Sequence, residues 1–256
     1  MTAPLDDLGL PVDAPPHVSR VVSLVPSLTE SVAVTAPGLL VGATDWCTHP
    51  SDLDVERVGG TKNPDVSRVI ALRPDVVVAN EEENRPADLA ALRDAGVAVW
   101  VTAPTTVPEG LRSLDRMLTL ACRLDRPAWL DAADAAWSAP APAAARRRAV
   151  VPIWRRPWMV LGRDTFAGDV LARLGVRNVF AGAADRYPKL APGDLAAVDA
   201  DLVVLPDEPY AFGPDDGPEA WPQTRPAFVS GRHLTWYGPS LTEAPALLNR
   251  QLQGAD

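Results

Sequence analysis

Two short runs of aliphatic residues constrain the fold of this chain more than any other feature. The sequence reads DVVVA at residues 75–79 and DLVVL at residues 201–205. Each run is short, aliphatic and free of polar alternation, which is typical of a strand buried on both faces of a parallel sheet. Because helices cover the faces of all-parallel sheets, we expect an α/β fold.

The two runs lie in matching contexts, which indicates two related lobes. A short segment with helical spacing precedes each run, at residues 66–72 and 192–198, and acidic residues follow, at residues 81–83 and 207–208. Open α/β sheets bind ligands beyond the carboxyl ends of their strands, so both acidic turns are candidate site segments. A crevice between two lobes is also a preferred place for a small ligand. Chance similarity of two ordinary helix–strand units is the alternative interpretation.

A proline-rich segment divides the chain. Pro140 and Pro142 stand two positions apart among alanines, and two such prolines do not fit inside one continuous helix. We therefore place an inter-lobe linker here. The predicted parts are a leader segment (1–19), an N-terminal α/β lobe (20–105), a helical connection with the Pro/Ala-rich linker (106–148) and a C-terminal α/β lobe (149–256).

Composition argues against several classes of function. The net charge of −9 at pH 7 offers no basic face for nucleic acid. No segment approaches the roughly 18 consecutive apolar residues of a membrane span, and residues 1–20 lack the apolar core of a secretory signal. Taking Met1 as the natural start, we expect a cytoplasmic protein.

The loop at residues 44–50, TDWCTHP, carries the densest set of reactive side chains. Cys47 and His49 place a thiol and an imidazole two positions apart, a spacing that can bind a transition metal if further ligands come from elsewhere in the chain. Carboxylates of the two acidic turns, Glu82 and Glu208, are the candidate further ligands. Contact with a ligand without a direct metal bond and ordinary packing are the alternative interpretations of this loop.

Aromatic residues lie at predicted strand ends or in loops in both halves of the chain. Each one alone is as compatible with packing as with ligand contact, whereas the set favours a sizeable planar or apolar ligand. Trp100 and Trp129 fall inside predicted elements and are expected in the core. The aromatic residues at strand ends and in loops are Trp46, Trp154, Trp158, Tyr187, Tyr210, Trp236 and Tyr237.

Several further elements are predicted from helix-capping residues and from prolines and glycines that end helices and strands. Ser27, with a glutamate three residues later, forms a capping-box pattern at the start of a helix over residues 27–36. Residues 213–226 are rich in proline and glycine and are expected to be a loop. Residues 233–236 are predicted to form the last strand, followed by a helix over residues 241–253.

Three sequence runs together indicate a family resemblance. VVSLVPSLTE at residues 21–30, VGG and NP within residues 58–64, and IALRPDVVV at residues 70–78 closely resemble the vitamin B12 and ferric-siderophore binding proteins of ABC importers. The resemblance covers most of residues 20–105 and, more loosely, residues 150–252. The runs GGTKNP, ANEEEN and PDEPY are similar to the branch described as helical backbone metal receptors.

The resemblance implies two three-layer α/β/α lobes with mostly parallel sheets, joined by a helical connection, with the ligand cleft between the lobes. It implies a non-catalytic binding protein that holds a metal chelate of the corrinoid, haem or siderophore type, or a metal ion. An enzyme acting on a tetrapyrrole or a siderophore is the alternative, although no nucleophile elbow, P-loop or GxGxxG pattern supports it. A further alternative is an importer receptor whose signal peptide is missing from this chain.

The chain departs from the importer receptors at several places. Ser67 and Gly193 stand where importer-docking members carry a surface glutamate in each lobe, so we expect no docking to a permease through these positions. The two prolines of the linker interrupt the region of the long connecting helix. Thr61 and Asn80 occupy positions at which importer proteins have aromatic residues. We therefore expect a cytoplasmic relative that keeps the cleft.

The family's cleft, the acidic turns and the loop aromatics together give the candidate site. Its members lie at the carboxyl ends of predicted strands or in the loops beside them. The candidate ligand-binding residues are Pro26, Thr29, Trp46, Thr61, Lys62, Asn63, Asn80, Glu82, Tyr187, Tyr210, Trp236 and Tyr237. The candidate ligands of a directly bound transition metal are Cys47, His49, Glu82 and Glu208.

Overall fold

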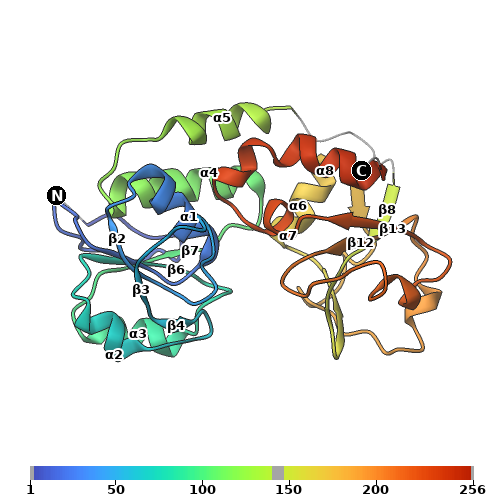
Figure 1. Ribbon diagram of the computed structural model, residues 1–256, viewed down its shortest axis with the longest axis horizontal. Coiled ribbons are helices and arrows are strands. Elements are labelled where there is room, and N and C mark those ends of the chain that lie inside the picture. Colours follow the sequence, from blue (N-terminus) through green and yellow to red (C-terminus); the bar gives the residue numbers. More distant parts are fainter. Residues whose placement is uncertain (1–2, 140–146, 255–256) are drawn as a thin grey trace. The chain divides into compact units, whose positions relative to one another are not determined.

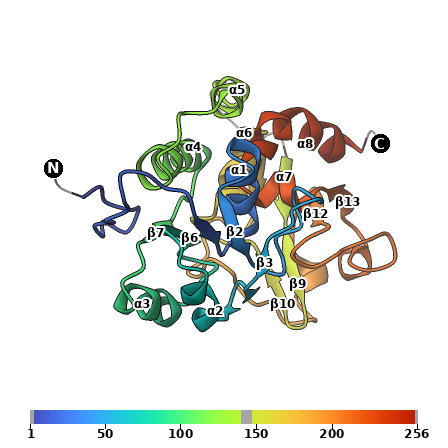
Figure 2. The same ribbon diagram turned by 60° about the vertical axis from the view of Figure 1, so that its left-hand side comes forward.

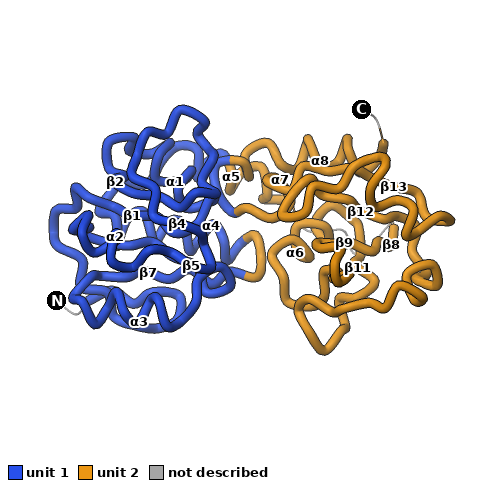
Figure 3. Tube along the Cα trace, turned by 60° about the horizontal axis from the view of Figure 1, so that its bottom comes forward, with its two compact units in different colours: residues 1–104, 108–132, 237–239 blue, residues 105–107, 133–236, 240–256 orange. Residues whose placement is uncertain are grey.

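The computed structural model describes residues 3–139 and 147–254. The chain divides into two compact units (Figure 3). The predicted linker prolines, Pro140 and Pro142, lie outside the described residues. Unit 1 contains residues 1–104, 108–132 and 237–239, and unit 2 contains residues 105–107, 133–236 and 240–256.

Unit 1 is built around a five-stranded parallel sheet with the strand order β3-β2-β1-β6-β7. All five residues of β6 are buried, and Val76 pairs with Val21 at the start of β1. The first apolar run is therefore an interior strand of this sheet, as its composition predicts. The strands are β1 (Val21–Ser23), β2 (Leu40–Ala43), β3 (Glu56–Arg57), β6 (Val76–Asn80) and β7 (Val99–Thr102).

Helices cover both faces of the unit 1 sheet. α2 and α3 lie on one face, and α1 and α4 lie on the other (Figure 1). Val69 of α2, Leu92 of α3 and Val77 of β6 belong to one core cluster and have no exposed surface. In the described residues, no helix is long and apolar enough to span a membrane. The helices are α1 (Pro26–Thr35), α2 (Val66–Ala71), α3 (Pro86–Asp94), α4 (Val107–Arg116) and a π-helical turn (Met117–Ala121). α5 (Ala128–Ala136) begins in unit 1 and continues into unit 2 from residue 133.

The N-terminal segment covers one edge of this sheet. Asp7 N donates to Val101 O at 3.1 Å, and Val101 N donates to Asp6 Oδ2 at 3.3 Å. Arg116 of α4 pairs with Asp7 at 2.6 Å. Residues 3–18, predicted as part of a leader segment, thus pack onto unit 1 and satisfy backbone groups of the edge strand β7.

α1 begins before the predicted N-cap residue. Pro26 occupies the first position of the helix, and Val25 is the N-cap without a side-chain bond to the helix. Ser27 is buried, and its carbonyl accepts a hydrogen bond from Ser31 Oγ at 2.7 Å. The capping-box prediction at Ser27 is wrong because proline, which has no N–H to satisfy, itself suits the first position of a helix.

Unit 2 contains a four-stranded parallel sheet, with the order β11-β8-β12-β13, and an antiparallel hairpin. The second apolar run forms β12, in which all five residues are buried. α6, α7 and α8 lie together on one face of this sheet (Figure 2). The elements are β8 (Arg147–Val150), β9 (Pro152–Arg155), β10 (Trp158–Val160), α6 (Phe166–Arg173), β11 (Val176–Asn178), β12 (Leu202–Pro206), β13 (Arg225–Val229), α7 (Gly231–Thr235) and α8 (Ala244–Gln253).

The other face of the unit 2 sheet is covered by the hairpin, loops and short 3-10 helices. Trp158, Phe212 and Trp221 form a core cluster with Val203 and Leu205 of β12. Where a helix over residues 192–198 is expected, a 3-10 turn forms at η2 (Leu195–Ala197), and a second one forms at η3 (Pro218–Ala220). Large aromatic side chains supply the buried surface that a longer helix would otherwise provide.

The last strand of unit 2 is not the predicted one. β13 begins inside the segment 213–226, which is predicted as a loop, whereas residues 233–236 fall in and just after α7. β13 lies at the edge of its sheet and pairs with β12. One side of an edge strand has no partner strand, so the missing N–H of Pro226 is tolerated there. The final helix begins as a 3-10 turn, η4 (Pro239–Thr242), before α8.

An aspartate with the same structural role precedes each of the two apolar runs. Asp75 Oδ2 accepts hydrogen bonds from Ser19 N and Arg20 N, at 2.7 and 2.9 Å, just before β1. Asp201 Oδ2 accepts from Arg148 N of β8 at 2.7 Å. The hydrogen bond from Ser19 N is the main cause that lowers the pKa of Asp75. Each aspartate secures the neighbouring strand at the amino end of its sheet.

Candidate functional site

The carboxyl ends of the unit 1 strands bring several predicted site residues to one edge of the sheet. Pro26 follows β1, Trp46 follows β2, and Asn80 ends β6. A two-residue antiparallel ladder, β4 (Gly59–Gly60) with β5 (Asn63–Pro64), places Thr61 and Lys62 in its turn. This carboxyl edge is the part of an open α/β sheet at which ligands bind.

Asn80 is the centre of a buried hydrogen-bond network. Its Nδ2 donates to Tyr237 Oη at 2.7 Å and to Thr102 O at 2.9 Å. Thr102 Oγ1 lies 2.8 Å from Tyr237 Oη and donates to Ala79 O at 3.0 Å. Burial raises the pKa of Tyr237, so its hydroxyl stays protonated at neutral pH. Both Asn80 and Tyr237 are thus engaged in holding the edge rather than presented to solvent.

The same asparagine fixes the acidic turn that follows β6. Asn80 Oδ1 accepts from Glu82 N at 2.8 Å and from Glu83 N at 3.1 Å, and Asn84 Oδ1 accepts from Asn80 N at 2.9 Å. Asn84 Nδ2 reaches Thr61 O at 2.9 Å, which ties the turn to the β4–β5 ladder. The backbone of the turn is therefore held in one conformation by the two asparagine side chains.

The turn of the β4–β5 ladder and the acidic turn lie against each other. The Lys62 ammonium donates a hydrogen bond to the carbonyl oxygen of Glu82. Lys62 and Asn63 are exposed, whereas Thr61 and Glu82 are half-buried. Four of the predicted ligand-binding residues are thus brought together by contacts within unit 1.

Trp46 presents its indole to solvent beside the β4–β5 ladder. It is 67% exposed, the largest exposure among the large hydrophobic residues that the structure describes. A Cβ placed on Gly60 would lie 3.5 Å from Trp46 Nε1 and 2.6 Å from Asn63 Oδ1. The side chains of Trp46 and Asn63 thus both lie beside the backbone of Gly60.

Arg57 holds the loop that carries Trp46, a role that sequence reasoning missed. Its guanidinium donates to Thr44 O at 3.0 Å, to Cys47 O at 2.9 Å and to Leu53 O at 3.2 Å. These carbonyls belong to the loop after β2, so Arg57 gives the loop a fixed shape under the exposed indole. No local pattern in the sequence marks an arginine that bonds to three carbonyl groups.

The direct metal site stays a prediction, and the surroundings of Cys47 do not favour it. Cys47 and Thr29 have no exposed surface, and Thr29 Oγ1 donates to Cys47 Sγ at 3.0 Å. Burial raises the pKa of the Cys47 thiol, which disfavours the thiolate that a metal needs. Among residues 3–139 and 147–254, no three His, Cys, Asp or Glu side chains form a group that could hold a metal ion. The burial of Cys47 fits the packing interpretation of this loop.

In unit 2, Tyr210 belongs to an aromatic group at the carboxyl end of β12. Its ring lies 5.7 Å from that of Trp154 in an edge-to-face arrangement and 4.6 Å from that of Phe212. Tyr210 Oη donates to Asp216 Oδ2 at 2.6 Å. Trp154, on the hairpin, is 43% exposed. The exposed indole and the half-buried phenol form an aromatic surface of the kind that the sequence predicts for a planar ligand.

Arg155 follows Trp154 in β9 and is held by two carboxylates. It pairs with Asp216, and its Nη2 lies 2.7 Å from Glu219 Oε1. Its guanidinium stacks over Trp158 at 5.3 Å from the ring centre. The positive charge of Arg155 is therefore balanced by two carboxylates of unit 2.

The other predicted residues of unit 2 lie on separate loops. Glu208 is half-buried, and a Cβ on Gly231 would overlap it, so glycine is required there. The half-buried Tyr187 follows Arg186, whose carbonyl accepts from Gly162 N at 2.8 Å. Trp236 is half-buried, with the Arg232 guanidinium 6.0 Å from its ring centre.

Ser230, His233 and Glu243 form a hydrogen-bonded chain that the sequence does not predict. Ser230 Oγ lies 2.8 Å from His233 Nδ1, and Glu243 Oε1 lies 2.9 Å from His233 Nε2. The order serine, histidine, acid is that of a hydrolase triad, but the N–H of Gly231, next to the serine, already donates to Asp207 at 2.6 Å. The hydrogen bond from His233 lowers the pKa of Glu243. This chain connects α7 to the start of α8.

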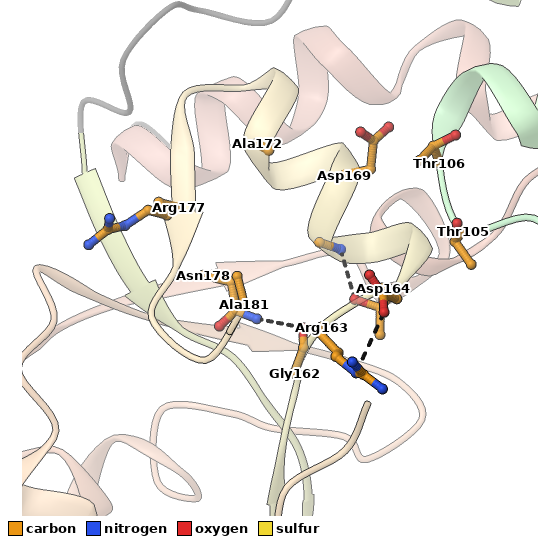
Figure 4. A pocket seen from close by; sticks show the side chains of 12 residues that line it. Thr105, Thr106, Gly162, Arg163, Asp164, Asp169, Ala172, Arg177, Asn178 and Ala181 are labelled. Atoms are coloured by element: carbon orange, nitrogen blue, oxygen red, sulfur yellow. Dashed lines mark hydrogen bonds and ion pairs between the residues drawn. The ribbon is translucent and has the colours of Figure 1, made fainter. Parts of the chain in front are cut away.

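A pocket of about 350 Å³ lies in unit 2 (Figure 4). The loop 162–165, the first turns of α6 and the end of β11 line it, together with Thr105 and Thr106. Its Asp169 accepts from Val107 N and Arg173 Nε, both at 2.7 Å. None of the predicted site residues lines this pocket, and its buried polar groups hold the backbone.

The two positions predicted to lack docking glutamates are both exposed. Ser67 lies on α2, and Gly193 lies before η2. Neither side chain can form the ion pair that a glutamate would form with an arginine of a permease. The absence of docking stays a prediction.

The model of the periplasmic binding protein family matches residues 21–219. The chain belongs to this family. That membership confirms the predicted family and the predicted α/β class. The match covers the unit 1 sheet and three strands of the unit 2 sheet, and it ends before β13.

Relatives within the family share moderate sequence identity with this chain. The vitamin B12-binding protein of Salmonella typhimurium is 26% identical over 191 residues, which cover 73% of this chain and 71% of that protein. The vitamin B12-binding protein of Vibrio cholerae is 29% identical over 92 residues, 35% of this chain, and the match spans only 33% of that protein. The crystal structure of a periplasmic haem-binding protein from Pseudomonas aeruginosa superposes with a TM-score of 0.69 at 26% identity and covers 91% of this chain and 92% of that one.

These relatives are binding proteins by name, and none of the three is named as an enzyme. The chain is thus related to non-catalytic substrate-binding proteins, as the sequence predicts. The relatives differ in the ligand that their names give, so the family alone leaves the ligand of this chain open.

Proposed function

We propose that this chain is a non-catalytic receptor for a metal chelate of the corrinoid, haem or siderophore type. Its family relatives are named for vitamin B12 or haem, which are both metal chelates of large flat macrocycles. A small-molecule ligand of this size fits a protein that carries exposed aromatic side chains on a firmly held edge of a sheet.

The observation that supports this proposal most is the exposed indole of Trp46 on a rigid support. Trp46 is 67% exposed, although its loop is held by three hydrogen bonds from Arg57. An indole on an ordered loop offers a flat apolar face that a planar ligand can stack on. Trp154 provides a second exposed indole at the carboxyl edge of unit 2.

Native mass spectrometry of the protein purified from its own host tests this function. We expect an added mass of several hundred daltons or more, which survives a chelator wash and carries the absorption bands of the chelate. A bare chain that also fails to quench its tryptophan fluorescence with any added corrinoid, haem or ferric siderophore would contradict the proposal. An added mass of a single metal ion, removed by the chelator, would support the direct metal site that the geometry of Cys47 does not support.

The cellular compartment is a separate part of the proposal. Cytoplasmic residence stays a prediction, and fractionation of the host cells with an antibody to this chain tests it. Recovery in an extracytoplasmic fraction would favour the importer receptor that the sequence left open as an alternative.

A further inference from the structure

We infer that Thr29, Cys47 and Arg57 are positioning residues that act through Trp46, because they fix the turn that presents its indole before any ligand arrives. The inference rests on the proposed function, since it names residues that determine how tightly the receptor binds its chelate. It also gives a new role to two residues that the sequence offers as a ligand contact and a metal ligand, Thr29 and Cys47. It follows from hydrogen bonds that reach one short turn from α1, β3 and β4.

The residues on either side of Trp46 are both hydrogen-bonded through their backbone. Before the indole, Asp45 N donates to a carbonyl oxygen of β4 at 2.9 Å. After it, Cys47 N donates to Thr44 O at 3.1 Å and closes a tight turn around the residue that carries the exposed ring. We call this segment, residues 44–47, the Trp46 turn.

The side chain of Cys47 anchors the Trp46 turn in the protein interior. It has no exposed surface. Its Sγ accepts from Thr29 Oγ1 of α1 at 3.0 Å and lies 3.1 Å from Thr44 Oγ1, and both threonines are fully buried as well. Because this buried group directly follows the exposed indole in the sequence, the turn cannot shift without disturbing closely packed side chains.

Arg57 spans the Trp46 turn from its first residue to its last. From β3, its Nη1 donates to Thr44 O at 3.0 Å and to Cys47 O at 2.9 Å. A guanidinium group suits this task, because its planar fork presents N–H donors in fixed directions. The half-buried Arg57 side chain therefore holds the backbone on both sides of the indole at once.

A turn that is fixed before binding raises affinity without touching the ligand. Ordering a mobile side chain or loop on binding costs conformational entropy, and that cost is subtracted from the affinity. Trp46 lies on a backbone that is already ordered, so a planar ligand that stacks on its ring avoids most of this cost. Release of the turn should weaken binding about three- to tenfold.

Calorimetric titration of the full chain with two separate probes, cyanocobalamin and haemin, tests the role of Arg57. Arg57→Met removes the donors and should weaken the probe that the wild-type protein binds by about three- to tenfold. Arg57→Lys keeps the charge without the planar fork and should also weaken it. Arg68→Met is the matched control, because Arg68 likewise donates to a backbone carbonyl, that of Arg57 at 2.8 Å, but lies on α2. Full affinity in Arg57→Met, or its full recovery in Arg57→Lys, would overturn the positioning role.

The two buried cysteines provide a second matched pair. Cys47→Ala removes the sulfur to which Thr29 donates and should weaken the same probe about threefold. Cys122→Ala removes an equally buried sulfur at the end of the π-helical turn, so it controls for lost packing and should leave the affinity unchanged. Equal losses of affinity in the two variants would overturn the role of Cys47.

A double variant tests whether Arg57 acts through the indole. If it does, Arg57→Met should weaken binding no further once Trp46→Ala has removed the ring, because two changes to one interaction are not additive. Multiplied losses in the double variant would show that Arg57 acts independently of Trp46. Thermal melts verify that every variant is folded.

Fluorine NMR of the protein labelled with 5-fluorotryptophan tests the turn without any ligand. The Trp46 signal is assigned by its loss in Trp46→Ala. In Arg57→Met this signal should move and narrow while the signals of the other tryptophans stay in place, and an unchanged Trp46 signal would overturn the inference. Failure of the wild-type chain to bind cyanocobalamin, haemin or a ferric catecholate would contradict the proposed function, and the fluorine signal would still decide whether Arg57 fixes the turn.

Discussion

The central strands of the two units end differently, although the sequence repeats the same pattern in both. β6 ends in Asn80, whose carboxamide bonds to Tyr237, to Thr102 and to the acidic turn. β12 ends in Pro206, which has no polar side chain, and the turn after it is held by Asp207 Oδ1 accepting from Gly231 N and by packing of aromatic rings. Unit 1 thus fixes its edge with buried hydrogen bonds and unit 2 with aromatic burial.

This difference shows that two segments with the same sequence pattern can be stabilised by different interactions. The aspartate before each strand keeps the same role in both units, at the amino end of the sheet. At the carboxyl end, where a ligand is expected, the two units have diverged. Four tests, taken in order of the effect expected on stability, measure how far this divergence goes.

The largest loss of stability is expected in the aromatic unit. Trp221 is 1% exposed and lies edge-to-face on Trp158 with ring centres 5.1 Å apart. Trp221→Ala should lower the free energy of unfolding by about 3–5 kcal/mol, measured by urea denaturation. Trp154→Ala, at an exposed position of the same aromatic group, is the control and should cost about 1 kcal/mol or less. Equal losses for the two would show that the cluster is not a packed core.

The second test removes the buried polar network of unit 1. Asn80→Leu leaves Tyr237 Oη and two backbone N–H groups without the partner they have now. We expect a loss of about 2–4 kcal/mol, with faster hydrogen exchange in β6 and β7 than in β12. Tyr237→Phe, which removes one hydroxyl, should cost only about 1 kcal/mol. Faster exchange in unit 2 alone would contradict the assignment of this network to unit 1.

The third test concerns the feature that the two units share. Asp75→Asn and Asp201→Asn should each cost about 1 kcal/mol, because the amide keeps an acceptor but loses the charge. The pKa of Asp75 is lowered in the folded state, so its contribution is present above the unfolded pKa of about 3.9 and is lost as pH falls through the lower folded value. Urea denaturation between pH 2 and 6 should therefore show a weaker pH dependence in Asp75→Asn. An unchanged profile would exclude Asp75 as the titrating group.

The smallest effect on stability is expected at the most exposed ring. Trp46→Ala should change the free energy of unfolding by no more than about 0.5 kcal/mol, yet it should weaken binding of the chelate that the receptor takes, tested with a corrinoid and with haemin, about tenfold. Isothermal titration of Trp46→Ala and Trp154→Ala side by side would show which unit contributes more to the ligand. Full affinity in both variants would show that neither exposed indole contributes to ligand binding.

Much of unit 1 could be predicted from the sequence because its elements are regular. The valines of β6 and the family motifs indicate elements that the structure has. The buried role of Asn80 and Tyr237 could not be predicted, because their hydrogen bond joins residues 157 positions apart. Arg57 was missed for a similar reason, since its carbonyl partners are set by the path of a loop.

Unit 2 was predicted less well because aromatic packing replaces regular helices. Pro226 made an edge strand resemble a loop, and the residues around His233 resembled a strand although they belong to a short helix. Cys47 shows the limit of spacing as a guide to metal sites: its neighbours in space are the hydroxyls of Thr29 and Thr44, which sequence distance alone does not reveal.

Three residues near the end of the chain, 237–239, belong to unit 1 although the sequence on both sides of them belongs to unit 2. Tyr237 completes the network of Asn80 and Thr102, and Gly238 approaches α1 so closely that a Cβ would lie 3.2 Å from Ser27 O. A gene fragment that stops after residue 132 therefore encodes an incomplete unit 1. Recombination between relatives cannot exchange one unit as a single stretch of DNA without breaking this contact, which favours inheritance of the two units as a pair.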